Sequence, residues 1–354
     1  MPPKVQAKMR NGHATSPALL LVSARADSRL REEVAAGRRP RPEYLELERR
    51  HGMELFDWSR LGQAGRRTEL LSLRHVAAAV PRLRGHVAVF SDGEHLGIPL
   101  ALALAVGPSI PHVVIGHWLT RSKKRPFFRV LKAHRWMTKI IVHSRTQLEI
   151  AVRDLGIPRE RLRFVPYCAD TQFWRPGEAA AERLVVSAGL EHRDFATLDT
   201  ACASIDCDVT VAAASLHTPE AVRTMPGPST KVKLVSLDHL SLRELYAKAA
   251  VVAVPLVPND FQAGVTTLLE AMSMGKAVVV SATEGQRDIV VDGETGILVP
   301  PGDSVALARA LERLLDDPSE RARLGRNARR AVEASFSLEA YVDAIAATLV
   351  EAAA

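Results

Sequence analysis

The chain has 354 residues, of which 47% are hydrophobic and 25% are charged, and its formal net charge is +7. This balance excludes a disordered or fibrous chain, and the length suits two globular domains of ordinary size. The longest apolar run, residues 98–106, is far too short to span a bilayer.

Charge is divided unevenly between the two halves of the chain. Residues 1–175 carry 31 Lys and Arg against 15 Asp and Glu, a net charge of +16, whereas residues 176–354 carry a net charge of −9. Such a split suggests that the first half meets an anionic partner, although it does not identify that partner.

The start of the chain and its cysteines indicate a compartment. Residues 1–16 are basic and polar, and no apolar region of a signal peptide follows them, so we expect a disordered tail. The three cysteines form neither a disulfide framework nor a metal-ligand spacing. We therefore expect a cytoplasmic protein.

Short apolar runs alternate with helical patterns along the whole chain. In the first half we predict strands at 18–22, 87–91, 111–115, 139–143 and 162–165, and helices at 97–105 and 145–155. In the second half we predict strands at 184–188, 209–213, 231–235, 251–255 and 277–281, and helices at 195–204, 241–249, 264–274, 304–315 and 319–334. The strands are rich in Val and Leu without clean alternation, which is typical of sheets covered by helices on both faces. The pattern predicts an α/β protein with two parallel, doubly wound sheets.

A Pro-Gly break within residues 174–183 coincides with the change in charge and indicates the domain boundary. We expect Rossmann-like domains over residues 17–175 and 176–335, followed by a closing segment over 336–354. Two such domains facing each other would form a cleft at the carboxyl ends of their strands, where ligands bind in such sheets.

The stretch FQAGVTTLLEAMSMGKAVVVSA, residues 261–282, holds the most informative motif. It carries a carboxylate, Glu270, among apolar residues of a helix that should begin near Gly264. A glycine at a helix start lets backbone N–H groups approach a ligand, and the helix dipole favours an anion there. Spacing alone leaves open whether Glu270 faces solvent or receives a ligand.

Residues 251–303 resemble the nucleotide-sugar domain of the GT4 family of GT-B glycosyltransferases. The matching pieces are EAM at 270–272, GKAVV at 275–279, DG at 292–293 and LVPPGD at 298–303. Two earlier segments also resemble the family, namely VPYCAD at 165–170 with Phe173, and SLRELY at 241–246. The resemblance extends from about residue 111 to the end of the chain.

The resemblance implies a GT-B fold, with an N-terminal acceptor-binding domain and a C-terminal nucleotide-sugar-binding domain. Segment 336–354 would contain the helix that crosses back to the first domain. The implied activity is retaining transfer of a sugar from a UDP-, GDP- or other nucleotide-diphosphate-sugar donor to an acceptor. The family needs no divalent metal and no cofactor, and the acceptor stays unidentified.

Site residues follow by matching positions. Glu270 would bind the ribose hydroxyls as a bidentate acceptor. The family's first acidic position is here Gln262, which puts the donor sugar in doubt, and Asp260 could substitute for the missing charge. The implied donor-binding set is Gly189, Arg193, Gln262, Ala263, Gly264, Val265, Thr266 and Glu270.

The implied catalytic residues are Arg193 and His117. Family members place an Arg and a Lys after the first strand of this domain; here Arg193 falls at the Lys position, and Leu190 occupies the place of the Arg. An arginine can clamp phosphate oxygens bidentately. His117 matches the family's strand-terminal histidine, which approaches the donor sugar. A solvated Arg193 and a structural His117 are the alternatives.

Other segments are less specific. Residues 118–139 mix eight Lys and Arg with four aromatic residues, as a peripheral membrane contact or a phosphorylated lipid acceptor would require. An amphipathic helix with a solvated cationic face is the alternative, and no nucleic-acid recognition motif accompanies the segment. The run Asp206-Cys207-Asp208 resembles a metal-binding Asp-x-Asp but precedes an apolar strand, so we expect a turn and no metal.

Two rival functions remain open. One is a nucleotide-sugar-binding protein without transferase activity, which Gln262 and the missing Arg would fit. The other is a sugar-nucleotide epimerase, which would act on the donor without an acceptor. A dinucleotide-dependent dehydrogenase is disfavoured because no G-x-G-x-x-G follows an expected strand.

Overall fold

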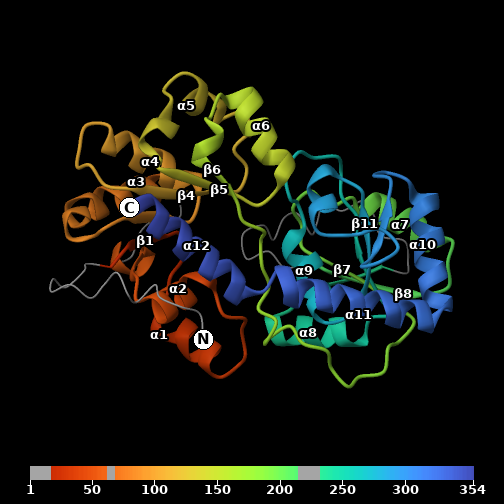
Figure 1. Ribbon diagram of the computed structural model, residues 1–354. Helices are drawn as coiled ribbons and strands as arrows, with labels where there is room; N and C mark the ends of the chain where they lie inside the picture. Colours follow the sequence, from red (N-terminus) through yellow and green to blue (C-terminus); the bar gives the residue numbers. More distant parts are fainter. Residues whose placement is uncertain (1–16, 62–67, 214–231) are drawn as a thin grey trace.

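The computed structural model describes residues 17–61, 68–213 and 232–354. Two parallel sheets lie side by side, one in each half of the chain (Figure 1). The first has the strand order β2-β1-β3-β4-β5-β6 and the second β12-β11-β10-β7-β8-β9. The tail predicted over residues 1–16 lies outside the described residues.

The first half supplies one sheet and the helices around it. Its strands are β1 (Leu19–Val22), β2 (Glu54–Asp57), β3 (Val89–Ser91), β4 (His112–Gly116), β5 (Lys139–Val142) and β6 (Leu162–Phe164). Its α-helices are α1 (Ser28–Ala35), α2 (Glu43–His51), α3 (Thr68–Ala79), α4 (Glu94–Leu104), α5 (Arg125–Arg129) and α6 (Arg145–Leu155). Short 3₁₀ segments lie at η1 (Trp58–Leu61), η2 (Val80–Gly85), η3 (Ala133–Trp136) and η4 (Arg159–Arg161).

The second half repeats this arrangement. Its strands are β7 (Leu184–Ala188), β8 (Asp208–Ala212), β9 (Val232–Val235), β10 (Val251–Val254), β11 (Ala277–Ser281) and β12 (Ile297–Val299). Its helices are α7 (Phe195–Ala203), α8 (His239–Lys248), α9 (Val265–Ser273), α10 (Ser304–Asp316), α11 (Pro318–Ser335) and α12 (Leu338–Ala353), with a 3₁₀ segment η5 (Glu284–Asp288).

Each strand predicted from the sequence is present, with its ends shifted by two residues at most. Residue 231, the first of the strand predicted at 231–235, lies outside the described residues. Strands β2 and β12 and helices α1 to α3 were not predicted. Both strands are short edge strands, and β2 carries an acidic residue at each end, so neither forms an apolar run long enough to be recognised.

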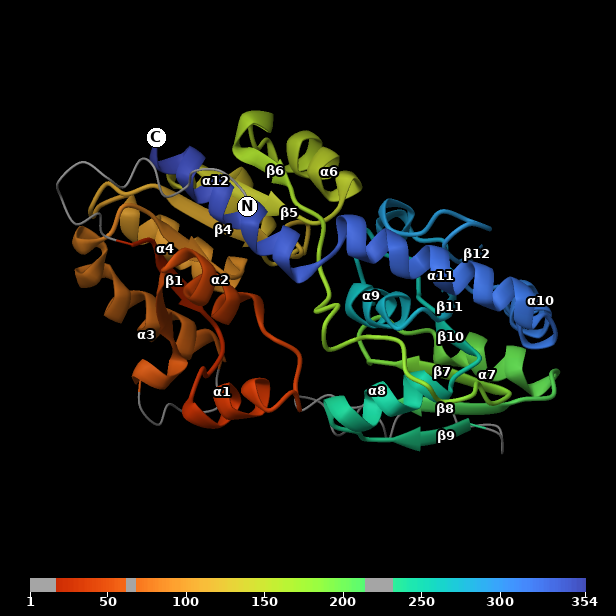
Figure 2. The same cartoon turned by 60° about the horizontal axis from the view of Figure 1, so that its bottom comes forward.

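Apolar side chains cover both faces of each sheet, as parallel sheets require. Helix α12 is the exception to the order along the chain. Its buried residues Leu338, Tyr341 and Ile345 belong to the apolar cluster of the first sheet, so the C-terminal helix covers the N-terminal domain (Figure 2).

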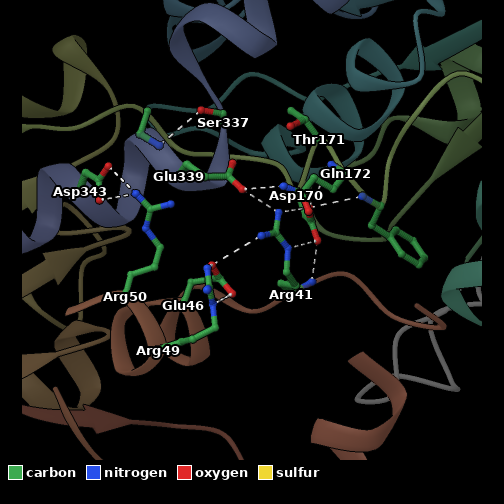
Figure 3. A network of polar contacts seen from close by, with 12 residues as sticks. Arg41, Glu46, Arg49, Arg50, Asp170, Thr171, Gln172, Ser337, Glu339 and Asp343 are labelled. Atoms are coloured by element: carbon green, nitrogen blue, oxygen red, sulfur yellow. Dashed lines mark hydrogen bonds and ion pairs between the residues drawn. The ribbon is translucent and has the colours of Figure 1, made fainter. Parts of the chain in front are cut away.

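The chain therefore crosses between the domains twice, and the two crossings lie side by side. The amide of Ala169 donates to the carbonyl of Phe336 at 2.9 Å, and the amide of Leu338 donates to the carbonyl of Ala169 at 3.0 Å. Arg41, just before α2, ties both crossings to the N-terminal domain. Its guanidinium contacts Asp170 at 2.6 Å and Glu339 at 2.8 Å (Figure 3).

Candidate functional site

The two domains meet through aromatic residues at the carboxyl ends of β4 and β10. Trp118 lies two residues beyond the end of β4, and its ring stacks on Phe261 of the loop after β10, with centroids 4.5 Å apart. The same indole meets the edge of His192, from the loop after β7, at 5.4 Å. The strand ends of the two sheets therefore face a common region, where ligands bind in folds of this kind.

The loop between β7 and α7 is pinned to the loop after β10. The amide of Val257 donates to the carbonyl of His192 at 3.1 Å, and the amide of Asp194 donates to the carbonyl of Pro255 at 3.0 Å. Gly189 opens this loop with φ of 79°, and His192 has φ of 53°, a left-handed conformation that is uncommon outside glycine. The hydrogen bonds between the two loops, together with the left-handed conformations of Gly189 and His192, place Arg193 over the start of α9.

Arg193 is held by neutral acceptors only. Its Nε donates to the carbonyl of Ala188 at 2.9 Å, and its Nη2 donates to Oγ1 of Thr267 at 3.0 Å. A third bond runs to the carbonyl of Glu191, and no ion pair among the described residues includes Arg193. Burial lowers the pKa of Arg193 to about 10, so the group stays positive at neutral pH.

Two glycines allow the guanidinium to lie where it does. A Cβ added to Gly189 would stand 2.8 Å from Nη2 of Arg193, and one added to Gly264 would stand 2.8 Å from Nη1. Gly264 is also the N-cap of α9, with φ of 75°, and no side chain of the described residues bonds to the free N–H groups of that turn as a cap. A partly buried cation and an uncapped helix start therefore adjoin, an arrangement that suits an anion.

Glu270 lies one and a half turns into α9 and is buried. Its Oε2 accepts a hydrogen bond from the Tyr246 hydroxyl at 3.2 Å. Burial raises the pKa of Glu270 to about 8, although Tyr246 and Arg193 both act in the opposite direction. Tyr246 of α8 is therefore a partner of this carboxylate within the protein, and the other carboxylate oxygen can still accept from a ligand.

Gln262 turns its amide toward the η5 segment. Its Nε2 donates to the carbonyl of Gly285 at 3.1 Å, while its buried Oε1 finds no partner within the described part of the chain. Gln286 shows the same pattern, since its Nε2 donates to the carbonyl of Ala263 at 2.7 Å and its Oε1 is left unpaired. Two buried amide oxygens thus await hydrogen-bond donors beside the loop after β10.

His117 directly follows β4 and is exposed. Its Nε2 lies 2.8 Å from the carbonyl of Asp92, and its own carbonyl accepts from Nε2 of Gln147 at 2.9 Å. Its ring stands 5.5 Å from that of the buried His143. The neighbouring Trp118 contact brings the end of β4, and His117 with it, next to the loops of the C-terminal domain.

The structure thus brings Gly189, Arg193 and Gly264 into direct contact, with Ala263 and Val265 on either side of Gly264. Thr266 is exposed in the first turn of α9. Sequence reasoning gave no role to the following contact residues: Trp118, His192, Tyr246, Phe261 and Thr267. Their one signal is position, since each adjoins or lies in a motif, but a single sequence does not show which distant residues touch.

Other features of the described residues can be stated briefly. In ranges 17–61, 68–213 and 232–354, no group of three or more His, Cys, Asp or Glu side chains is placed to hold a metal ion. Within the same ranges, no helix combines the length and the apolar character that crossing a membrane demands. Asp206 and Cys207 precede β8, whereas Asp208, which was expected in the turn, is the first residue of the strand.

Comparison with known proteins shows that part of this chain is similar to glycosyltransferases. Residues 230–331 match the family model described as glycosyl transferases group 1. An alpha-D-kanosaminyltransferase of Streptomyces kanamyceticus is 25% identical over 213 residues, which cover 55% of each chain. An MMP alpha-(1->4)-mannosyltransferase of Mycolicibacterium hassiacum is 27% identical over 287 residues, 72% of this chain and 68% of that protein. The matches therefore span about half to two thirds of these relatives.

Solved structures match over nearly the whole chain. Sucrose-phosphate synthase from Thermosynechococcus elongatus superposes with a TM-score of 0.74 at 20% identity, covering 95% of this chain and 98% of that one. HepE of Anabaena, solved in complex with UDP and glucose, gives 0.72 at 19% identity, covering 95% and 99%. At this level of identity the likeness shows the fold, while function must be argued from the site.

Proposed function

Since this chain has the GT-B fold and its second domain belongs to the glycosyl transferases group 1 family, we propose that it is a glycosyltransferase. It would move a sugar from a nucleotide-diphosphate-sugar donor to an acceptor hydroxyl. We expect retention of anomeric configuration and no need for a divalent metal.

The observation that carries this proposal is the environment of Arg193. A partly buried guanidinium without a carboxylate partner among the described residues is favourably placed to receive an anion. Here the cation adjoins the uncapped start of α9, so backbone N–H groups and the guanidinium can bind one diphosphate together. During transfer, negative charge grows on the leaving diphosphate, and this is where the site would stabilise it.

The remaining donor contacts follow from the same geometry. Glu270 would accept hydrogen bonds from the ribose hydroxyls, and the unpaired Oε1 of Gln262 would accept one from the sugar. A neutral amide can recognise a hydroxyl as well as a carboxylate can, so the change from an acidic residue alters the preferred sugar without removing the contact. HepE, which shares the fold, was solved with UDP and glucose, so this pair is a reasonable first ligand to test.

The reaction needs few groups from the protein. The bond between the anomeric carbon and the diphosphate oxygen breaks, the acceptor oxygen bonds to that carbon, and the acceptor proton passes to the leaving phosphate. His117, exposed beside the loops of the C-terminal domain, would contact the sugar during this exchange. Its imidazole is oriented by the carbonyl of Asp92, and both ring position and tautomer follow from that bond.

We also propose peripheral contact of the basic segment 118–139 with an anionic membrane surface. Val130 and Leu131, between Arg129 and Lys132, are 75% and 49% exposed. Apolar tips flanked by cations are typical of surfaces that insert at the lipid headgroup level. Binding to anionic vesicles and not to neutral ones would test this contact.

A binding protein without transferase activity is the second candidate. Leu190 packs against the apolar cluster of the second sheet, so the place of a second cation is taken by a core residue. In this case a single cation would hold the diphosphate without lowering the barrier enough for transfer. Tight donor binding with neither transfer nor slow hydrolysis would favour this candidate, and product from donor alone would favour an epimerase.

The proposal is tested by thermal stabilisation with UDP, GDP, ADP and TDP, without metal, for wild type and Glu270→Ala. A ligand at a hundred times its dissociation constant adds about 2.7 kcal/mol to the free energy of unfolding. We expect one nucleotide to stabilise the wild type and to lose most of that effect in the variant. If neither the nucleotides nor the intact nucleotide-sugars stabilise the wild type, the proposed donor site is wrong.

A further inference from the structure

A cavity of about 510 Å³ lies in the N-terminal domain, between α3, α4 and the segment that follows β4. This volume is within the range of small-molecule sites. Its walls are mostly apolar, from Leu73 of α3, Ile98 and Leu102 of α4, and Phe127 of α5. Charged groups line one part of the same cavity, namely Glu94, Arg121, Lys123 and Lys124.

The charges of this cavity do not cancel. Glu94 is buried and pairs with Lys124 at 3.2 Å. Burial alone would raise the pKa of Glu94, but Lys124 and His117 outweigh it and hold the pKa below its usual value. Arg121 and Lys123 take part in none of the ion pairs formed by the described residues, so the cavity keeps two positive charges.

The charged part of the cavity adjoins the proposed reaction site. Oε1 of Glu94 accepts from the amide of Trp118 at 2.7 Å, one residue after His117. Gly93, which precedes Glu94, lies against the ring of His117, since a Cβ there would stand 3.5 Å from its Cδ2. The charged part of the cavity therefore lies on the side of His117, which does not itself line the cavity, and the apolar part lies between α3 and α4.

We propose that this cavity binds the acceptor, and that the acceptor is an amphiphile with an apolar chain joined to a phosphate. The chain would lie against Leu73, Ile98, Leu102 and Phe127, and the phosphate would bind Arg121 and Lys123. That the bound amphiphile serves as the acceptor rests on the proposed function. The chemistry of the ligand rests only on the residues that line the cavity. A purely polar sugar acceptor would leave the apolar walls in contact with water, which makes it the poorer occupant.

Two leucines on α3 offer a matched pair for the test. Leu73 lines the cavity and Leu70 does not, yet their exposed fractions are 54% and 56%, so aspartate at either position should be tolerated equally by the fold. Two exposed cations offer a second pair, because Lys123 lines the cavity and Arg129 lies outside it. The variants are Leu73→Asp, Leu70→Asp, Lys123→Glu and Arg129→Glu.

The probe is dodecyl phosphate below its micellar concentration, with dodecyl maltoside and inorganic phosphate as partial probes, measured by calorimetric titration. We expect dodecyl phosphate to bind the wild type at least about tenfold more tightly than either partial probe. Leu73→Asp and Lys123→Glu should each weaken it about tenfold, whereas Leu70→Asp and Arg129→Glu should stay within about twofold of wild type. Saturating nucleotide should not change the affinity for dodecyl phosphate, because the donor and the acceptor would contact different residues.

Several results would overturn the assignment. If dodecyl maltoside bound as tightly as dodecyl phosphate, the phosphate would have no role in binding. If inorganic phosphate bound as tightly, the alkyl chain would have none. Equal losses in the matched variants would mean nonspecific detergent binding, and competition with the nucleotide would exclude an acceptor. If instead no nucleotide binds but dodecyl phosphate follows the expected pattern, the donor proposal fails and the amphiphile site stands.

Discussion

Two partly buried arginines in this molecule have opposite surroundings. Arg41, where the chain crosses between the domains, contacts the carboxylates of Asp170, Glu339 and Glu46 (Figure 3). Arg193, at the start of α9, contacts two carbonyls and a hydroxyl. Burial by itself would lower the pKa of both, but the carboxylates raise the pKa of Arg41 above its usual value, whereas that of Arg193 falls to about 10.

The difference separates a structural cation from one that waits for a ligand. Arg41 has its full set of anions within the protein, and it joins a loop of the N-terminal domain to both crossings. Arg193 has hydrogen bonds that fix its position, but its charge is not neutralised by a described residue. Charge balance therefore indicates function here more directly than burial does, because both side chains are partly buried.

The largest effect is expected from Arg41→Met. The change leaves the nearly inaccessible carboxylate of Asp170 without its cation, whereas Glu46 keeps Arg49 at 2.7 Å. Breaking a buried ion pair from one side costs about 3–5 kcal/mol, so the free energy of unfolding at pH 7 should fall by that amount in urea titrations. At temperatures where the variant stays folded, its nucleotide affinity should be close to that of wild type.

Arg50→Met is the control for this change. Arg50 also pairs with α12, through Asp343 at 2.8 Å, but both partners are partly exposed. Exposed pairs contribute at most about 1 kcal/mol, so this variant should be nearly as stable as wild type. Similar losses in the two variants would show that Arg41 acts as an ordinary surface contact.

Arg193→Met is expected to do the reverse of Arg41→Met, leaving stability nearly unchanged and weakening nucleotide binding, and its effect should be smaller. Removing a partly buried cation that has no ion-pair partner recovers part of its desolvation cost, so the free energy of unfolding without ligand should change by no more than about 1 kcal/mol. Nucleotide affinity should fall about a hundredfold, or about 2.8 kcal/mol, because the diphosphate loses its cation. Titration calorimetry with the nucleotide that stabilises wild type measures this loss.

Arg193→Lys distinguishes charge from geometry at the same position. A lysine keeps the charge but lacks the planar fork that spans Ala188, Glu191 and Thr267, so part of the affinity should return and part should not. If Arg193→Met destabilised the unliganded protein by several kcal/mol while nucleotide binding persisted, the two arginines would not differ in the way proposed.

Local signals made much of the fold predictable. Helix α6 occupies the predicted residues 145–155 because both of its ends are marked in the sequence. Ser144 caps the start by accepting from the amide of Gln147, and Gly156 ends the helix with φ of 65°. Strands β7 and β11 are likewise continuous Val-rich runs that fit only a buried position in a parallel sheet.

The rest depends on contacts that no local pattern records. Strand β2 is a strand because Leu55 and Phe56 pair with Leu20 and Leu21 of β1, which is far away in sequence. The partner of Glu270 is a tyrosine 24 residues earlier. The contact between Trp118 and Phe261 exists only because the domains face each other. Motifs predict where the candidate donor site lies. The absence of a described carboxylate partner for Arg193 follows only from contacts in the folded structure.

The smallest effect concerns protons at Glu270 and sharpens the contrast with Asp170, whose carboxyl Arg41 holds at a lowered pKa. Glu270 has a pKa of about 8, so it is mostly protonated at pH 7 when no ligand is bound. Ribose hydroxyls that donate to it would favour the ionised form, and binding would then release a proton. Nucleotide affinity should therefore rise with pH, by about tenfold between pH 6 and 8, and level off above pH 8.

Glu270→Gln should remove this dependence, because the amide does not titrate. The nucleotide phosphate titrates near pH 6 in both proteins, so the difference between their pH profiles isolates the contribution of the Glu270 side chain.

The raised pKa of Glu270 also makes a prediction for the free energy of unfolding. Because the folded carboxyl binds a proton that the unfolded chain releases above pH 4.5, the wild type should lose stability relative to Glu270→Gln as pH rises toward 8. Parallel profiles for the two proteins, in affinity and in unfolding, would mean that Glu270 is ionised throughout and that Arg193 already has its counter-charge within the protein.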